Sequence, residues 1–545
     1  MNNPKSIVII GGVAGGMSAA TRLRRLLEDA TITVLERSGN VSFANCGLPY
    51  YVGGVIEERS ALLLQTPESL FDRFRLDVRI HHEATAIDVA RRVVAVRDLA
   101  TGQESELAYD ALVLSPGARA VRPPIPGIDR ALTLRDIEDT DRMTEAIAGA
   151  GSAAVIGGGF IGLEVAENLR HRGLDVTVVE ATDQVMAPLD PEMARLVADA
   201  LEADGIAVRL GASAVEISEG GVRLADGDVV AADVVVAAIG VRPDTTLAAA
   251  AGIELGQAGG IAVDDELRTS APGVWAVGDV IEKRRPDGTA GLVPLAGPAN
   301  RQGRLAADSI AGLPVRNPRA LGTAVVGVCG LQVAATGVTE KALRASGRPH
   351  RVIHTHPLNH AGYYPGASAL ALKLLVDPDS DAILGAQAVG ASGADKRIDV
   401  IATAMTAGMT ASELLDLDLC YAPQFGSAKD PVNMLGYLAD NQHRGLVRTA
   451  QWHEVADLAT HGAMLLDVRT VGEFAAGTIP GAVNVPLDEV RERLDEIPVD
   501  AEVLVFCAVG QRGHSATRLL AQAGRTVRNL DGGIKTWRAG VRARP

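Results

Sequence analysis

The sequence has few cysteines, four in 545 residues, and few aromatic residues, which make up 3% of the chain. The cysteines are Cys46, Cys329, Cys420 and Cys507, and no two of them form a CxxC pair. This spacing argues against a disulfide framework and against a structural zinc site. Any cysteine chemistry must therefore use single thiols.

Long apolar runs and an excess of positive charge are also missing. No window reaches eighteen apolar residues, and the N-terminus passes into a strand pattern without the apolar core of a signal peptide. The net charge of −15 argues against nucleic-acid binding, which needs basic side chains that displace counterions. We therefore expect a cytoplasmic protein with neither nucleic acid nor membrane as a partner.

The length predicts three to four domains at roughly 150 residues each. Residues 7–36 and 154–180 repeat one pattern, in which a glycine-rich turn and a helix separate two apolar strands and a glutamate follows. This pattern predicts two Rossmann-like dinucleotide-binding domains in an α/β fold. The predicted limits are 1–118 with 246–322 for the first domain, 119–245 for the second, 323–443 for an α+β domain and 450–545 for a final α/β module.

The first glycine turn keeps Gly11 and Gly16 of a GxGxxG motif but has Val13 in place of the second glycine. Glu36 lies twenty residues after Gly16, at a strand end, where its carboxylate can bond a ribose hydroxyl pair. Phosphates would lie on the free amides at the start of the following helix. A turn that serves only strand–helix packing is the alternative.

The second glycine turn matches GxGxxG in full at Gly157, Gly159 and Gly162, and Glu180 ends the next strand. A 2′-phosphate about 4 Å from that carboxylate would meet repulsion on the order of 4 kcal/mol. The motif therefore predicts a strong preference for NADH over NADPH.

Together with the segments 115–118 (SPGA) and 277–279 (VGD), the two turns resemble the FAD-dependent pyridine nucleotide-disulfide oxidoreductases over residues 1 to about 440. In that family the first domain binds FAD and the second binds NAD(P)H. An aromatic residue in the second turn, here Phe160, gates the flavin, and a packing role for Phe160 is the alternative. The resemblance implies FAD contacts at Gly11, Val13, Gly16, Glu36, Ser115, Gly117 and Asp279, and NADH contacts at Gly157, Gly159, Phe160, Gly162, Glu180 and Gly240.

The segment 42–51 (SFANCGLPYY) is similar to the active-site segment of coenzyme A disulfide reductases and has no second cysteine. Segments 359–366, 393–399 and 421–423 carry further matches in order. The resemblance implies that Cys46 is the nucleophile and that Tyr363 and Tyr421 assist at the sulfur, with Tyr421 reaching in from the partner subunit of a homodimer. We expect a helix N-terminus and the flavin to lower the pKa of Cys46. The positions predicted to contact coenzyme A, as substrate or tightly bound ligand, are Arg22, Arg25, Ser42 and Asn45.

The last 95 residues resemble a rhodanese domain. The matches include residues 467–469 (DVR), 479–482 (IPGA), 531–533 (DGG) and a six-residue loop from Cys507 to Arg512. A loop of this length forms an amide cradle for a persulfide sulfur, and Cys507 near Arg512 at a helix start is expected to be a reactive thiolate. A non-catalytic docking module is the alternative.

These patterns predict an enzyme that passes electrons from NADH through FAD to Cys46, which cleaves a sulfur–sulfur bond of coenzyme A persulfide, polysulfide or disulfide. Cys507 would handle sulfane sulfur. The rivals are a plain coenzyme A disulfide reductase with an accessory rhodanese domain, an NADH oxidase and a redox sensor. We expect no metal at His354, His356 and His360. We expect Cys329 to be a core residue and Cys420 to pack beside the site, with a resolving thiol as the alternative for Cys420.

Overall fold

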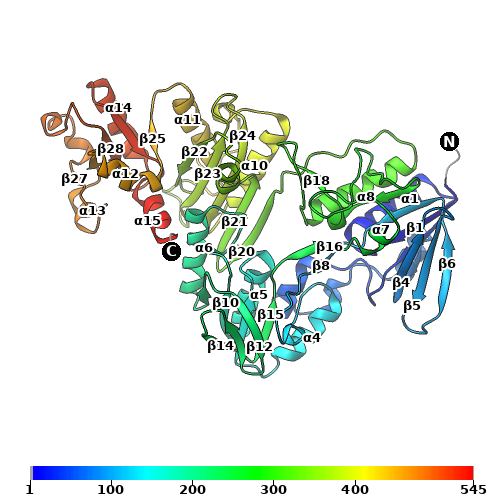
Figure 1. Cartoon of the computed structure of the whole chain (residues 1–545). Coiled ribbons are helices and arrows are strands. Elements are labelled where there is room, and N and C mark those ends of the chain that lie inside the picture. The colour runs from blue at the N-terminus through cyan, green and yellow to red at the C-terminus, as the bar shows by residue number, and fades with distance from the viewer. Residues whose placement is uncertain (1–3, 544–545) are drawn as a thin grey trace. The chain divides into compact units, whose positions relative to one another are not determined.

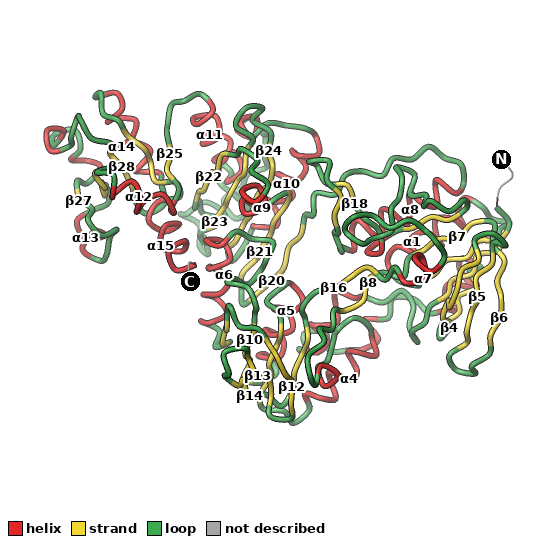
Figure 2. The backbone as a smooth tube through the Cα atoms, in the orientation of Figure 1, coloured by secondary structure: helices red, strands yellow, loops and turns green. Residues whose placement is uncertain are grey.

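The computed structural model describes residues 4–543 (Figures 1 and 2). Its contacts divide the chain into two units, residues 1–179 with 212–322 and residues 180–211 with 323–545. Among the described residues, none of the helices has the length and apolar content that crossing a membrane requires.

The first unit is built around a five-stranded parallel sheet with the order β17-β7-β1-β2-β3. Its central strands are almost fully buried, as expected for a sheet covered on both faces. Helices α1 and α8 pack closely, because Gly303 lets one helix approach the backbone of the other at Gly15. The elements are β1 (Ser6–Ile10), α1 (Ala14–Leu26), β2 (Thr31–Leu35), β3 (Asp77–Arg79), β7 (Ala111–Leu114), β17 (Val274–Ala276) and α8 (Ala296–Ile310).

A second parallel sheet in this unit repeats the strand, turn and helix plan. Strand β9 pairs in parallel with β10 and β15, and α5 follows β9. The unit also contains two three-stranded antiparallel sheets, with the orders β4-β5-β6 and β12-β13-β14. The elements are β4 (His82–Asp88), β5 (Val93–Asp98), β6 (Glu104–Ala108), β9 (Ser152–Ile156), α5 (Phe160–His171), β10 (Asp175–Val179), β12 (Ala214–Ser218), β13 (Gly221–Leu224), β14 (Val229–Ala231) and β15 (Val234–Ala237).

The second unit contains an antiparallel sheet with the order β20-β21-β24-β23-β22, so that β22 is an edge strand. Helices α6, α10 and α11 pack against it. The apolar pattern of the sequence predicts a strand over 370–376 and a helix over 395–408, and both are present. The elements are α6 (Pro191–Ala203), β20 (Ala324–Val328), β21 (Leu331–Gly337), α9 (Glu340–Ala345), β22 (Arg351–Thr355), β23 (Leu370–Val376), β24 (Ile383–Gly390), α10 (Ala394–Ala407) and α11 (Pro431–His443).

The same unit ends in a five-stranded parallel sheet with the order β25-β29-β28-β26-β27. Its last helix, α15, lies beside α6 (Figure 1). The elements are β25 (Thr449–Ala450), β26 (Met464–Asp467), β27 (Val483–Asn484), β28 (Val503–Phe506), α14 (Gln511–Gln522), β29 (Val527–Leu530) and α15 (Gly533–Ala543).

The apolar spacing over 488–494 predicts a helix in the C-terminal module, and this prediction is wrong. Two separate three-residue 3-10 turns, Leu487–Glu489 and Leu494–Glu496, stand there instead. Val490 and Ile497 are both buried in the core of this module, and tertiary packing of this kind overrides a local helical preference.

Candidate active sites

The first glycine turn is shaped to bring a ligand close to the backbone. Gly11 has a φ of 105°, and a Cβ there would lie 2.0 Å from the carbonyl oxygen of Ser115. A Cβ at Gly16 would lie 1.9 Å from the carbonyl oxygen of Gly11. Val13 is the residue before α1 and needs no such space, which explains why the motif tolerates it. The amides at the start of α1 are therefore open to a phosphate.

Glu36 lies beside this turn and is buried. Its carboxylate accepts hydrogen bonds from the Gly12 amide at 2.8 Å and from the Ser38 amide and hydroxyl at 2.9 Å. A carboxylate held at the end of β2 in this way is placed as the ribose-binding acid of a dinucleotide site.

Asp279 supplies a second test of whether a cofactor fits. It lies in the 3-10 turn Gly278–Val280, and its Oδ1 is buried without a hydrogen-bond partner among the described residues. Burial raises the pKa of this carboxyl, although Lys283 and Arg135 oppose the effect. A buried carboxylate oxygen without a donor is rare, so a hydroxyl donor from a ligand fits this position. The site therefore suits FAD. Gly117, with a φ of 74°, has open space at its Cβ position near the same strand ends.

The second glycine turn has the same construction. Gly157 has a φ of 109°, and a Cβ there would lie 2.4 Å from the carbonyl oxygen of Ala238. A Cβ at Gly162 would lie 1.9 Å from the carbonyl oxygen of Gly157, whereas Gly159 faces open space before α5. Phe160 is the first residue of α5 and is half-buried, and Gly240 is exposed with a φ of 101°. The glycine turn thus leaves the start of α5 open to a pyrophosphate, as NADH requires.

Glu180 belongs to the second unit, whose boundary falls directly after β10. Its carboxylate accepts 2.8 Å hydrogen bonds from the amide and the hydroxyl of Thr182. Its role toward the nicotinamide cofactor stays a prediction.

Cys46 lies in the 3-10 turn Asn45–Gly47, directly before the short helix α2 (Leu48–Val52). The residue is exposed, yet the surrounding protein desolvates its thiol. This desolvation, together with the charges of Glu164 and Asp279, raises the pKa of Cys46. The protein's own groups thus act in the direction opposite to the one expected from a helix N-terminus. Because the thiolate is the reactive form, its formation needs a positive or electron-withdrawing neighbour, which bound flavin can supply.

Two residues near Cys46 were missed by the sequence reasoning. The Tyr50 hydroxyl donates a 2.9 Å hydrogen bond to Glu164 on α5. Burial raises the pKa of Glu164, and burial together with this carboxyl raises the pKa of Tyr50. The available signal was that Glu164 follows Phe160 by one helical turn, which places both on one face of α5.

The residues expected to contact coenzyme A differ in whether their side chains are already bonded to other residues of the chain. Arg22 donates to the Asp308 carboxylate at 2.7 Å, so its charge is already paired. Arg25, one turn further along α1, is exposed. Ser42 has a φ of 51°, which turns the chain toward Cys46, and Asn45 donates its side-chain amide to the carbonyl of Arg135 at 3.3 Å.

Tyr363 and Tyr421 are exposed, and their hydroxyls are 2.8 Å apart in one chain. The hydrogen bond raises the pKa of Tyr363. We expected only Tyr421 to come from a partner subunit. Since the two hydroxyls are bonded to each other, the tyrosines belong to one surface of the same chain.

In the C-terminal module, Cys507 follows β28, is fully buried and begins a loop that leads into α14. Gly510 has a φ of 91°, which lets the loop turn back. Arg512 makes two bonds to the Glu473 carboxylate at 2.6 and 2.7 Å, and these raise the pKa of Arg512 and hold that of Glu473 at about 2. The module therefore presents a buried thiol under loop amides and next to a fixed guanidinium.

Neither of the other two cysteines is fully buried, which corrects the expectation that Cys329 is a core residue. Cys420 is exposed. Cys329 is half-buried in the turn between β20 and β21, with a φ of 45° and its Sγ 3.8 Å from Asp204.

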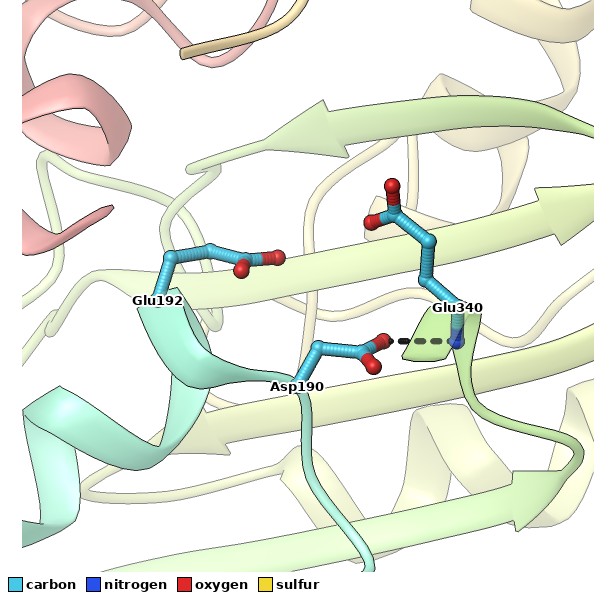
Figure 3. A group of neighbouring side chains, drawn as sticks. All are labelled: Asp190, Glu192 and Glu340. Carbon is cyan, nitrogen blue, oxygen red and sulfur yellow. Dashed lines mark hydrogen bonds between the residues drawn. The ribbon is translucent and has the colours of Figure 1, made fainter. Parts of the chain in front are cut away.

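Three buried carboxylates, Asp190, Glu192 and Glu340, converge as a metal site would require (Figure 3). Figure 3 also shows the 3.0 Å bond that the Glu340 amide donates to Asp190. However, the Lys373 ammonium lies among them, at 3.0 Å from Asp190 and 2.5 Å from each glutamate. Because a buried charge needs a partner, these carboxylates are assigned to Lys373.

Two dinucleotide turns, a lone thiol beside the first of them and a separate buried thiol under a loop define a flavin-dependent oxidoreductase with an attached sulfur-handling module. The chain belongs to the pyridine nucleotide-disulphide oxidoreductase family, whose model matches residues 5–303. The family's dimerisation domain matches residues 323–431, and a rhodanese-like domain matches residues 451–540. The predictions of fold class, FAD and NADH are thereby confirmed.

Three relatives are close to this chain over most of its length. Coenzyme A disulfide reductase of Staphylococcus aureus strain JH9 is 36% identical over 437 residues, 79% of this chain and 99% of that protein. The structure of reduced Bacillus anthracis CoADR-RHD is 45% identical with a TM-score of 0.98, over 100% of this chain and 99% of its own. A NAD-dependent persulfide reductase from A. fulgidus is 38% identical with a TM-score of 0.92, over 98% of this chain and 100% of its own.

Proposed function

We propose that this protein is an NADH-dependent reductase of coenzyme A persulfide, polysulfide and coenzyme A disulfide, with Cys46 as its nucleophile. The observation that carries the proposal is a single exposed thiol beside Asp279, the carboxylate that suits FAD, with no other cysteine near it in the sequence. The relatives named as coenzyme A disulfide reductase and persulfide reductase support this choice of substrate.

Bound FAD would accept a hydride from NADH and supply two electrons to sulfur. The Cys46 thiolate attacks the carbon-bonded sulfur of coenzyme A persulfide. This attack forms a Cys46–coenzyme A disulfide and releases the outer sulfur as hydrosulfide. Two electrons then break this disulfide and restore the Cys46 thiolate and free coenzyme A. The raised pKa of Cys46 keeps the resting thiol protonated in the absence of a neighbouring charge.

We assign protonation of the leaving thiolate to the Tyr363–Tyr421 pair of the partner subunit in a homodimer. The hydroxyls are exposed in one chain, and Phe425 adds an exposed ring that is 72% accessible. Exposed aromatic residues of this kind are typical of a surface that meets another protein. The match to the family's dimerisation domain supports the dimer.

Coenzyme A binding is assigned to Arg25, Ser42 and Asn45, since Arg25 is exposed on α1 and the other two flank Cys46. Arg22 has its charge paired with Asp308, so we place it at the edge of this site. Cys507 is assigned the role of sulfane-sulfur carrier.

Anaerobic NADH oxidation by the yellow protein tests the proposal, with coenzyme A persulfide, coenzyme A disulfide and polysulfide as substrates and sulfide measured. We expect turnover on all three, with kcat/KM higher for the persulfide than for the disulfide. Cys46→Ser should abolish NADH-dependent turnover and Cys507→Ser should lower polysulfide turnover, while Cys329→Ser serves as a control. A higher kcat/KM for the disulfide would favour a plain disulfide reductase instead. Unchanged polysulfide turnover in Cys507→Ser would rule out the carrier role.

A further inference from the structure

The edge strand β22 of the antiparallel sheet holds the rhodanese-like module of the same chain. The His354 backbone amide and its Nδ1 both lie 2.8 Å from the same oxygen of Asp531. His356, two residues on, lies 2.7 Å through its Nε2 from the Thr536 hydroxyl. Residues two apart on a strand point the same way, so both rings meet the segment 531–536. Neither contact belongs to the two active sites described above.

The segment 531–536 also packs against the loop that begins at Cys507. The Ile534 amide donates to the carbonyl of Cys507 at 2.9 Å, and the Lys535 amide donates to the carbonyl of Ala508 at 3.1 Å. A Cβ at Gly533 would lie 2.5 Å from the Cys507 carbonyl oxygen. Only two residues therefore separate Asp531, which His354 contacts, from Ile534, whose amide bonds the Cys507 carbonyl.

The His354 ring is buried and lies between two carboxylates. Its Nδ1 faces Asp531, and its Nε2 faces Glu192 at 3.0 Å. Only an imidazolium donates from both ring nitrogens, so this geometry requires the charged form. Burial opposes the charge, but the two carboxylates outweigh it and raise the pKa of His354 to about 9.

Further contacts near His354 hold Glu192 in place and join the rhodanese-like module to the rest of the unit. Glu192 also receives the Lys373 ammonium at 2.5 Å, which fixes it on α6. Gln451, at the start of the module, donates to Asp531 at 3.2 Å. At the far end of α15, Arg542 makes two bonds to Asp199 on α6, at 2.6 and 2.9 Å. His356 is neutral by contrast, since burial, Lys535 and His354 lower its pKa to about 3.

We propose that His354 is a positioning residue for sulfur transfer at Cys507: by fixing Asp531, it lets the dimerisation domain set the conformation of the thiol-bearing loop of the same chain. The proposal rests on the sulfur-carrier role proposed for Cys507. It implies that the rhodanese-like module works as a docked part of the reductase.

Two substitutions of His354 each keep one of the two hydrogen bonds that its ring makes. His354→Asn places an amide donor where Nδ1 stands and keeps the bond to Asp531, whereas His354→Gln places it where Nε2 stands and keeps the bond to Glu192. The full-length FAD-containing enzyme is assayed for sulfur transfer from thiosulfate to cyanide, which yields sulfite and thiocyanate. We expect His354→Gln to lose about tenfold in kcat and His354→Asn to lose clearly less. His443→Gln, an exposed histidine at the end of α11, is the matched control.

Hydrogen exchange of the amides of residues 507–512 gives a readout that needs no activity. We expect faster exchange in His354→Gln and near wild-type exchange in His354→Asn. Equal exchange in both variants would overturn the proposal. If wild-type protein transfers no sulfur from thiosulfate but the exchange pattern appears, the carrier role of Cys507 fails, and only the effect of His354 on the conformation of the loop stands. Should His354→Gln not fold, Asp531→Asn tests the same bond from the module's side and should speed exchange in the same loop.

Discussion

The Tyr50 hydroxyl donates a 2.9 Å hydrogen bond to the Glu164 carboxylate, and Glu164 in turn raises the pKa of the Cys46 thiol. This pair joins α2, which follows the nucleophile, to α5, which begins at the second glycine turn. The charge on Glu164 therefore influences when Cys46 becomes a thiolate.

We expect Glu164→Gln to lower the pKa of Cys46 part of the way, because burial raises this pKa most and the nearby negative charge adds to the rise. The alkylation rate of Cys46 by iodoacetamide, followed against pH, measures this. In the wild type the rate should rise with pH above the usual thiol range, since a raised pKa delays thiolate formation. The Glu164→Gln curve should shift to lower pH. Glu145→Gln, an exposed glutamate on α4 (Ile137–Ile147), should leave the curve in place.

The tyrosine pair predicts strong coupling between two substitutions. Tyr363→Phe and Tyr421→Phe each remove one partner of the 2.8 Å hydroxyl contact. We expect each to lower kcat/KM for coenzyme A persulfide about tenfold and the double variant to fall little further, because groups that act as a unit are not additive. Two independent effects that multiply in the double variant would contradict the pairing.

Gly533 is expected to accept no side chain. It has a φ of 64°, and a Cβ would meet the Cys507 carbonyl oxygen at 2.5 Å. Gly533→Ala should destabilise the rhodanese-like module by roughly 1–3 kcal/mol and sharply reduce thiosulfate sulfurtransferase activity, with NADH-dependent reduction of coenzyme A disulfide preserved. Gly472→Ala, in helix α13 (Val471–Ala475), is the matched control, since no atom lies within 4 Å of its Cβ position. Calorimetry of both full-length variants measures the difference.

Cofactor choice is expected to depend on Glu180. Glu180→Ala removes the charge predicted to repel a 2′-phosphate, which is worth on the order of 4 kcal/mol before screening. We expect kcat/KM for NADPH to rise by about 10- to 100-fold, with kcat/KM for NADH reduced. Steady-state kinetics with both cofactors measure the ratio. An unchanged ratio would mean that Glu180 does not face the adenosine ribose.

Local patterns were sufficient for much of the fold. The strand at Leu370–Val376 and the helix at Ala394–Ala407 follow from apolar spacing and flanking glycines. The 3-10 turns near Leu487 and Leu494 escaped prediction, because the apolar spacing there fits a helix and tertiary packing overrides such a local preference. Cys329 was expected in the core and is only half-buried, since burial depends on neighbours that are distant in the sequence.

The sequence by itself determined the two glycine turns, the lone Cys46, the six-residue loop after Cys507 and the acids at positions 36 and 180, because each is a local motif whose residues lie within one turn, strand or loop. Only the tertiary structure decided that Glu164 raises the Cys46 pKa, that Tyr363 and Tyr421 share one surface, and that His354 is held between Glu192 and Asp531. These relationships join residues 58 to 177 positions apart or place charges across separate helices. Their energies depend on burial, and burial is a property of the packed chain.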